Sequence, residues 1–227
     1  MTEMPRIEIR EATDEDSLKV LMLLQQCFIQ QYATAGYESR IGNRRFEVTE
    51  DQITSLLAKM ISTATDLEAE GKSLPKTEVT KKDYFVCATR DEEIVGTTLG
   101  YKIGDLDNER EDQAVEKAYF EGLGYESAWY VKSVYVKSGN QRKGIGSYLM
   151  DLQIRAALKR SATRLILEVT EYNSDAIAFY KKMGMKIREG VYREVPLGGQ
   201  IPLPLIIMEL DLTKIKIEDT APDSKSG

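Results

Sequence analysis

The 227 residues are enough for one sizeable hydrophobic core, and we expect a single domain over residues 1–212. The formal net charge of −6 argues against a nonspecific nucleic-acid-binding protein, which would carry a basic excess to meet phosphates. The chain contains no histidine, which excludes Ser/His/Asp and Cys/His nucleophiles, and no metal site is expected. Its two cysteines, Cys27 and Cys87, are far apart and predict buried thiols rather than a disulfide.

No apolar run in the sequence approaches the roughly 20 residues that span a bilayer. The first ten residues, MTEMPRIEIR, lack the apolar segment of a signal peptide. We therefore expect a cytoplasmic protein with no membrane partner.

The first hundred residues predict one strand, two helices and a hairpin, in that order. Residues 7–10 alternate apolar and polar side chains, as a short strand does. Capping residues at 13–16 and 49–52 each precede apolar side chains at helical spacing, which predicts helices from 13 to 28 and from 49 to 71. A polar loop over 72–82 then leads to apolar strands over 84–88 and 94–101, which flank a charged turn.

Two blocks of opposite charge follow the hairpin. Residues 104–126 form an acidic insertion with eight carboxylates and two basic side chains, whereas residues 130–164 hold eight basic side chains and one carboxylate. A solvated surface is the ordinary explanation for either block. The basic block contains a glycine-rich turn, however, and this coincidence favours the binding of an anion there.

The glycine-rich turn reads NQRKGIGS and occupies residues 140–147, between an apolar strand over 129–136 and an amphipathic helix. Glycine lets a ligand approach the backbone, and the unpaired amides of a helix's first turn favour phosphate. A nucleotide-hydrolysing P-loop is disfavoured, because Ile145 stands where that motif needs lysine. A dinucleotide-binding fingerprint also fails, because Leu149 occupies the place of its third glycine.

The segment downstream of this turn carries a longer pattern. An apolar strand, RLILEV at 164–169, is followed by Asn173, Ala176, Tyr180 and Gly184. Together with the turn, this order and spacing resemble the GNAT superfamily of acetyltransferases, except that Met185 replaces a common phenylalanine. The resemblance covers residues 129–210 but not the acidic insertion. It implies an α/β fold of the GNAT type, with a mixed, mostly antiparallel central sheet flanked by helices.

The resemblance implies acetyl-CoA as cosubstrate and no metal. Backbone groups of the strand would bind its pantetheine arm, the turn would wrap its pyrophosphate, and Asn173 would hydrogen-bond the arm from the other side. Tyr180 would bind near the sulfur and act as general acid. The implied cofactor-binding residues are Val134, Tyr135, Val136, Gln141, Arg142, Lys143, Gly144, Ile145, Gly146, Ser147, Asn173 and Tyr180.

Glu168 matches a glutamate that bacterial protein N-terminal acetyltransferases of the ribosomal-protein alanine type are thought to use as general base. The closing segment over 191–210 is also similar in outline to those enzymes. Ser138 and Asn140 depart from the residues common in the family, as does the proline-rich turn over 196–204. These departures bear on the acceptor more than on the cofactor.

The same side chains also have purely structural interpretations. Tyr180 could be an ordinary half-buried tyrosine, and Asn173 could cap a helix over 174–182. Glu168 could be a partner of Arg164 or Arg188 in an ion pair.

The function expected from the resemblance is an acetyl-CoA-dependent N-acetyltransferase, in which an amine attacks the thioester directly. The acceptor is a primary amine, either a small molecule or a peptide. A protein N-terminus, a lysine, a polyamine, an aminoglycoside and an amino acid all remain open, and the acidic insertion would attract a cationic acceptor. The alternative is a noncatalytic module that binds or senses acyl-CoA. The resemblance leaves open whether two copies of the chain form a homodimer through a sheet edge. The composition of residues 213–227 predicts a disordered tail.

Overall fold

The computed structural model describes residues 7–13, 16, 19, 20, 23, 84–197 and 201–215. The helix expected over 49–71 and the loop expected over 72–82 lie outside the described residues, as do Cys27 and most of the helix expected over 13–28. Val20 and Leu23 of that first helix are described, and both are buried. Cys87 is a free thiol that is fully buried, as predicted.

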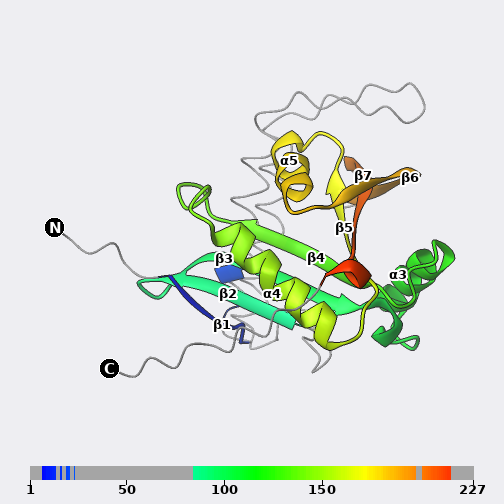
Figure 1. Ribbon diagram of the computed structural model, residues 1–227, viewed down its shortest axis with the longest axis horizontal. Coiled ribbons are helices and arrows are strands. Elements are labelled where there is room, and N and C mark those ends of the chain that lie inside the picture. The colour runs from blue at the N-terminus through cyan, green and yellow to red at the C-terminus, as the bar shows by residue number, and fades with distance from the viewer. Residues whose placement is uncertain are drawn as a thin grey trace.

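A seven-stranded sheet with the order β1-β2-β3-β4-β5-β7-β6 forms the centre of the described fold (Figure 1). Every neighbouring pair is antiparallel except β4 and β5, which run parallel. The fold class is therefore the one expected, and the strands expected over 7–10, 84–88, 94–101 and 129–136 are confirmed. The strands are β1 (Glu8–Glu11), β2 (Tyr84–Arg90), β3 (Glu93–Lys102), β4 (Trp129–Val136), β5 (Arg164–Thr170), β6 (Lys186–Leu197) and β7 (Ile201–Asp211).

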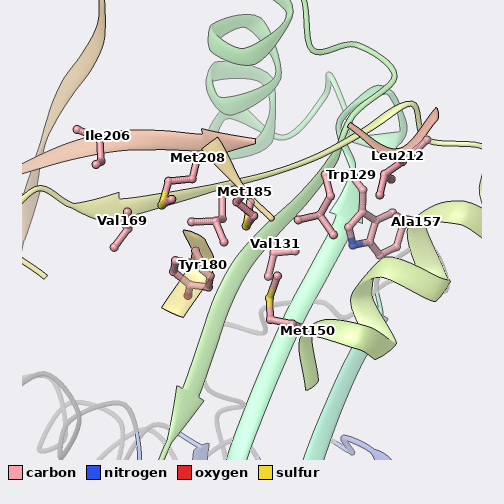
Figure 2. Packing of buried hydrophobic residues seen from close by; sticks show 13 residues of the cluster. Trp129, Val131, Met150, Ala157, Val169, Tyr180, Met185, Ile206, Met208 and Leu212 are labelled. Atoms are coloured by element: carbon pink, nitrogen blue, oxygen red, sulfur yellow. The ribbon is translucent and has the colours of Figure 1, made fainter. Parts of the chain in front are cut away.

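Two helices cover one face of this sheet. Helix α4 (Ile145–Lys159) lies across β2 to β4, and α5 (Ser174–Lys182) follows β5 (Figure 1). Their buried side chains pack with Trp129, Val131 and Leu167 from the strands. Figure 2 shows this cluster, with Tyr180 of α5 among the strand side chains. We call this the α4 face of the sheet.

The acidic insertion folds onto the opposite face. It forms a 3-10 turn, η3 (Ile103–Asp105), and a helix, α3 (Glu111–Gly122). Phe120 of α3 packs in one cluster with Tyr130 of β4 and Ile166 of β5, which alternate along their strands with the side chains that face α4. The insertion is therefore not a solvated loop, because one side of it belongs to the core. We call this the α3 face.

Strand β6 contains a large bulge that decides where its arginines point. The pairing with β7 passes from Ile187↔Met208 to Tyr192↔Ile206, so residues 188–191 oppose Ile207 alone. Side chains five positions apart point to opposite faces of a regular strand. Here Arg188 and Arg193 both reach the α3 face, where Arg188 donates to Tyr125 Oη at 3.1 Å and the Arg193 guanidinium stacks 4.4 Å from the Tyr119 ring.

The last described element is a 3-10 turn, η4 (Leu212–Lys214). Buried Leu212 anchors this turn in the main core. The predicted disordered tail over 213–227 is therefore wrong at its start, because Thr213 and Lys214 belong to the turn; residues 216–227 lie outside the described residues. Among the described residues, none of the helices has the length and apolarity that crossing a bilayer would require.

Candidate active site

The parallel strands β4 and β5 pair over a short stretch and then part. The ladder contains three residue pairs, Trp129↔Leu165, Tyr130↔Ile166 and Val131↔Leu167. Beyond Val131 both strands continue without pairing to each other, and Figure 1 shows them diverging. We call residues 132–136 and 168–170 the β4–β5 fork. A ligand in an extended conformation can in general bind beside a strand that has parted from its neighbour.

A bulge in β4 coincides with the start of the fork. Leu99 of β3 pairs with Ser133, but the next residue, Gly100, pairs with Val131, which leaves Lys132 as the extra residue. A bulge bends its strand and increases the local twist. The bend therefore directs β4 away from β5 at the point where their ladder ends.

The glycine-rich turn follows β4 directly and leads into α4. Gly139, Arg142 and Gly144 all have positive φ, at 79°, 59° and 84°. The backbone amides of residues 141–147 donate no hydrogen bond to any described residue. Gly144 caps α4 without a side-chain bond, and the first turn of the helix contains no acidic residue. Unpaired amides at a helix N-terminus in general favour the binding of an anion such as phosphate.

Two side chains predicted to bind the cofactor instead close the turn on itself. Gln141 Nε2 donates to the Val136 carbonyl at 3.1 Å, and Lys143 Nζ donates to the Gly139 carbonyl at 2.6 Å. Arg142 is exposed and donates to no described residue. Arg142 and Lys143 both keep their positive charge in the turn, but only Arg142 of the two is without a described hydrogen-bond acceptor, whereas Lys143 uses one of its three donors on Gly139.

Helix α5 lies beside the turn. A Cβ atom added to Gly146 would meet the Phe179 ring at 3.5 Å and Val136 Cγ2 at 3.7 Å. These are ordinary van der Waals distances, and they place the start of α4, the end of β4 and α5 in one contact region. Tyr180, the neighbour of Phe179, thereby lies on the same side of the fork as the glycine-rich turn.

Tyr180 is buried in the α4-face cluster, with 8% of its surface exposed. Its hydroxyl forms no hydrogen bond with any described residue. Burial raises the pKa of Tyr180 well above the ordinary value near 10. The side chain is therefore a protonated donor throughout the neutral range, with no acceptor of its own.

Asn173 caps α5, as its structural interpretation predicted. Its Oδ1 accepts from the Ala176 amide at 3.0 Å. The side-chain amide group donates to no described residue. Capping thus uses the oxygen of Asn173 and leaves its two N–H donors for a ligand.

Glu168 lies on the α3 face of the fork, across the sheet from Tyr180. Its side chain is 4% exposed and pairs with Arg193. Oε2 also accepts from Tyr130 Oη at 3.1 Å, whereas Oε1 is buried without a partner among the described residues. Burial raises the pKa of Glu168, and the Arg193 guanidinium opposes that rise.

The ion pair expected for Glu168 exists, but its partner differs from the expectation. Arg164 and Arg188 reach Glu209 instead, at 3.4 Å and 3.9 Å. The β6 bulge explains the difference, because it directs Arg193 onto the α3 face beside Glu168.

The α3 helix supplies two further polar side chains near the fork. Tyr119 Oη is buried without a partner among the described residues, and its pKa is raised by burial and by the charge of Glu168. Glu116 binds Lys132, the bulged residue of β4, at 3.3 Å and accepts a short hydrogen bond from Tyr101. Glu116, the carboxylate of the insertion that contacts fork residue Lys132, is thus already paired. Sequence reasoning missed Tyr119, Tyr130 and Arg193, because no local pattern connects them to Glu168.

A model of the "Acetyltransferase (GNAT) family" matches residues 54–185. The PaiA N-acetyltransferase of Thermoplasma acidophilum, solved with coenzyme A, is 17% identical and has a TM-score of 0.55, covering 91% of this chain and 99% of its own. YncA of Salmonella typhimurium, a putative acetyltransferase solved with acetyl-CoA, is 16% identical with a TM-score of 0.50, covering 96% and 98%.

The ribosomal-protein-S18-alanine N-acetyltransferase of Escherichia coli is 17% identical with a TM-score of 0.48, covering 94% of this chain and 98% of its own. At 17% and 16% identity, the Thermoplasma and Salmonella matches show the fold alone.

Proposed function

Because the chain belongs to the GNAT family of acetyltransferases, we propose that it moves the acetyl group of acetyl-CoA directly to a primary amine. The observation that carries this proposal is the run of unpaired amides over 141–147, located where β4 leaves β5. A diphosphate needs such donors, and an extended pantetheine arm needs the open strand beside them. Both occur at one end of the fork.

In this proposal the cosubstrate binds on the α4 face. The amides of the turn and the Arg142 side chain hold the pyrophosphate. The backbone of Val134, Tyr135 and Val136, together with the Asn173 amide group, holds the pantetheine arm. The coenzyme A and acetyl-CoA in the Thermoplasma and Salmonella structures support this assignment of the ligand class.

In this proposal, side chains on the two faces of the fork have different roles in the reaction. A neutral amine attacks the thioester carbonyl, the C–S bond breaks, and the nitrogen loses a proton as the thiolate gains one. Tyr180 lies on the α4 face and has no acceptor among the described residues, so its hydroxyl can donate a hydrogen bond to the departing sulfur. Glu168, on the α3 face, accepts the proton of the attacking amine through its unpartnered Oε1.

The raised pKa of Tyr180 refines this assignment. A thiol has an ordinary pKa of about 8.5, so tyrosine at its ordinary value of about 10 is already the weaker acid. Burial increases that difference. The tyrosine therefore stabilises the negative charge on the departing sulfur as a hydrogen-bond donor. Coenzyme A leaves as the thiolate and takes its proton from water, because complete transfer from Tyr180 is uphill even to the full thiolate.

The acceptor is proposed as a protein N-terminus, a lysine or a polyamine, in a cytoplasmic setting and without nucleic acid or membrane. A lysine or polyamine, with an amine pKa near 10.4, needs a base more than an N-terminus near 8 does. The pairing of Glu168 with Arg193 and of Glu116 with Lys132 makes the described fork close to neutral. We therefore expect kcat/KM to change little with salt concentration.

A thiol-release assay with acetyl-CoA and a panel of amines, with mass spectrometry of the products, tests the proposal. We expect thiol release with at least one amine class, and a Tyr180→Phe variant with kcat lowered about 100-fold. Its thermal stability should be unchanged, because the hydroxyl forms no hydrogen bond with a described residue. Tyr125→Phe is the matched control: it removes a 2.7 Å bond to Glu209 and should lower stability but not kcat.

Calorimetry with coenzyme A separates the ways in which this proposal can fail. Binding without thiol release from any amine would favour the noncatalytic acyl-CoA module. An absence of binding heat would overturn the assignment of the turn itself.

A further inference from the structure

A buried polar network holds the β4 bulge from the α4 face. Thr98 Oγ1 of β3 donates to the Ser133 carbonyl at 2.8 Å, next to the extra residue of the bulge. Gln153 of α4 donates to Thr98 Oγ1 at 3.2 Å. The network therefore connects the middle of α4, through one hydroxyl, to the residue at which β4 bends.

Both ends of the Gln153 side-chain amide, the nitrogen and the oxygen, form hydrogen bonds to residues of the sheet. Its Nε2 donates both to Thr98 Oγ1 and to the Tyr84 carbonyl, each at 3.2 Å. Its Oε1 accepts from Trp129 Nε1 at 2.8 Å. Gln153, Thr98 and Trp129 are all fully buried. Buried polar groups cost stability unless each is paired, and a fully paired network specifies one arrangement of the backbone around it.

The space for this network exists because position 100 is glycine. A Cβ atom there would lie 2.3 Å from Gln153 Oε1 and 2.5 Å from Trp129 Nε1. Gly100 is also the residue opposite Val131 at the register shift. The missing side chain, the bulge and the network therefore occur together at the last paired position before the fork.

We propose that Thr98 and Gln153 are positioning residues for acetyl transfer. They fix the bend at which β4 leaves β5, and so hold the β4 backbone in the orientation that binds the thioester arm of acetyl-CoA. Neither side chain touches the cosubstrate in this proposal, which rests on the proposed function. Loss of the Thr98 hydroxyl lets the Ser133 carbonyl and the bulge shift, so the acetyl group is held less well.

The neighbouring threonine provides a matched control. Thr97 is also fully buried, but its Oγ1 donates to the Val86 carbonyl of β2 at 3.1 Å, away from β4. Thr97→Val and Thr98→Val each replace one buried hydroxyl by a methyl group on adjacent residues of one strand. Only Thr98→Val removes a bond to the bulge.

The experiment measures the KM for acetyl-CoA, kcat and the thermal midpoint of the wild-type protein, Thr98→Val, Thr98→Ser and Thr97→Val. We expect Thr98→Val to lower kcat/KM about tenfold or more, and Thr98→Ser, which keeps the hydroxyl, to restore it. Thr97→Val should lose comparable thermal stability but keep kcat/KM within about twofold. Equal losses in both valine variants, or wild-type kinetics in Thr98→Val, would overturn the inference.

If Thr98→Val does not fold, the Gln153→Met variant tests the same inference. It removes the donor to Thr98 and keeps the side-chain length, so kcat/KM should fall while the protein remains folded. Wild-type kinetics in that variant would count against the inference. Coenzyme A binding by the wild-type protein is measured first, because an absence of binding would contradict the proposed function. If the wild-type protein binds coenzyme A but the variants keep wild-type kcat/KM, only the positioning role is contradicted.

Discussion

At the scale of single residues, the ionisation of Glu168 depends on two neighbours from distant parts of the chain. Tyr130 donates to Oε2 from β4, and Arg193 pairs with the same oxygen from β6. Burial raises the pKa of the carboxyl, and the guanidinium lowers it again. Arg193 thus keeps this nearly buried carboxylate ionised down to a lower pH than burial alone would allow.

Replacing Arg193 by Met should move the acid limb of the pH profile of kcat/KM to higher pH. A base acts only when it is deprotonated, so activity is present above the pKa of Glu168 and is lost as the pH falls through it. Because Arg193 lowers that pKa, its removal raises the pKa and shifts the loss of activity upward. The measurement is kcat/KM between pH 5 and 9, which reports the free enzyme.

Arg193→Lys and Arg164→Met are the controls for this profile. The first keeps the positive charge near Glu168, and the second removes an arginine that pairs with Glu209 instead. Neither should move the acid limb. Glu168→Gln should abolish the limb and lower kcat/KM, and an unchanged limb in Glu168→Gln would show that another group is the base.

At the scale of elements, the turn before α4 depends on backbone conformations that few residues adopt. Gly144 has a φ of 84° at the N-cap of α4, with no heavy atom near the position of a Cβ. The amides that follow it have no partner among the described residues. The geometry of the first helical turn and its unpaired donors are therefore both set at this one residue.

Gly144→Ala should weaken coenzyme A binding more than it weakens the fold. A side chain in the left-handed region costs roughly 1 kcal/mol, and a change of one or two amide contacts corresponds to about a tenfold rise in Kd. Gly124→Ala is the matched control, since it has a φ of 81°, equally open surroundings and a position far from the turn. The Kd of coenzyme A is measured by calorimetry, and equal Kd values in the two variants would contradict the proposed role of the turn.

At the scale of the whole molecule, the sheet consists of two antiparallel parts joined by one short parallel ladder. Strands β1 to β4 form one part and β5, β7 and β6 the other, and three residue pairs connect them. A ligand bound in the fork would contact both parts at once. Binding should therefore reduce local opening at the fork more than elsewhere.

Hydrogen exchange with and without coenzyme A tests this expectation. Amides of residues 141–147 have no described partner and should exchange fast in the free protein. Coenzyme A should slow their exchange, together with that of residues 132–136, while the β6–β7 pairing should change little. Protection confined to β6 and β7 would place the ligand elsewhere.

Much of the fold and part of the candidate site follow from local patterns. The apolar strand β4, the helix that follows the glycine-rich turn and the capping by Asn173 are each encoded within a few residues. The strand and the helix were predicted, and capping was the structural interpretation given for Asn173. The family resemblance implied that Tyr180 lies near the sulfur of the cosubstrate, and that placement stays a prediction. Local conformational preference and side-chain period are properties of short segments, so they can be derived from sequence.

The tertiary structure alone decided what surrounds Glu168. Arg193 reaches it through the pairings of β5 with β7 and of β7 with β6, and only because the β6 bulge reverses the side on which that arginine would lie. Tyr119 comes from a charge-rich insertion whose composition predicted a solvated surface, yet its aromatic side packs on the sheet. Strand register and bulges depend on contacts between distant segments, and no spacing along the chain records them.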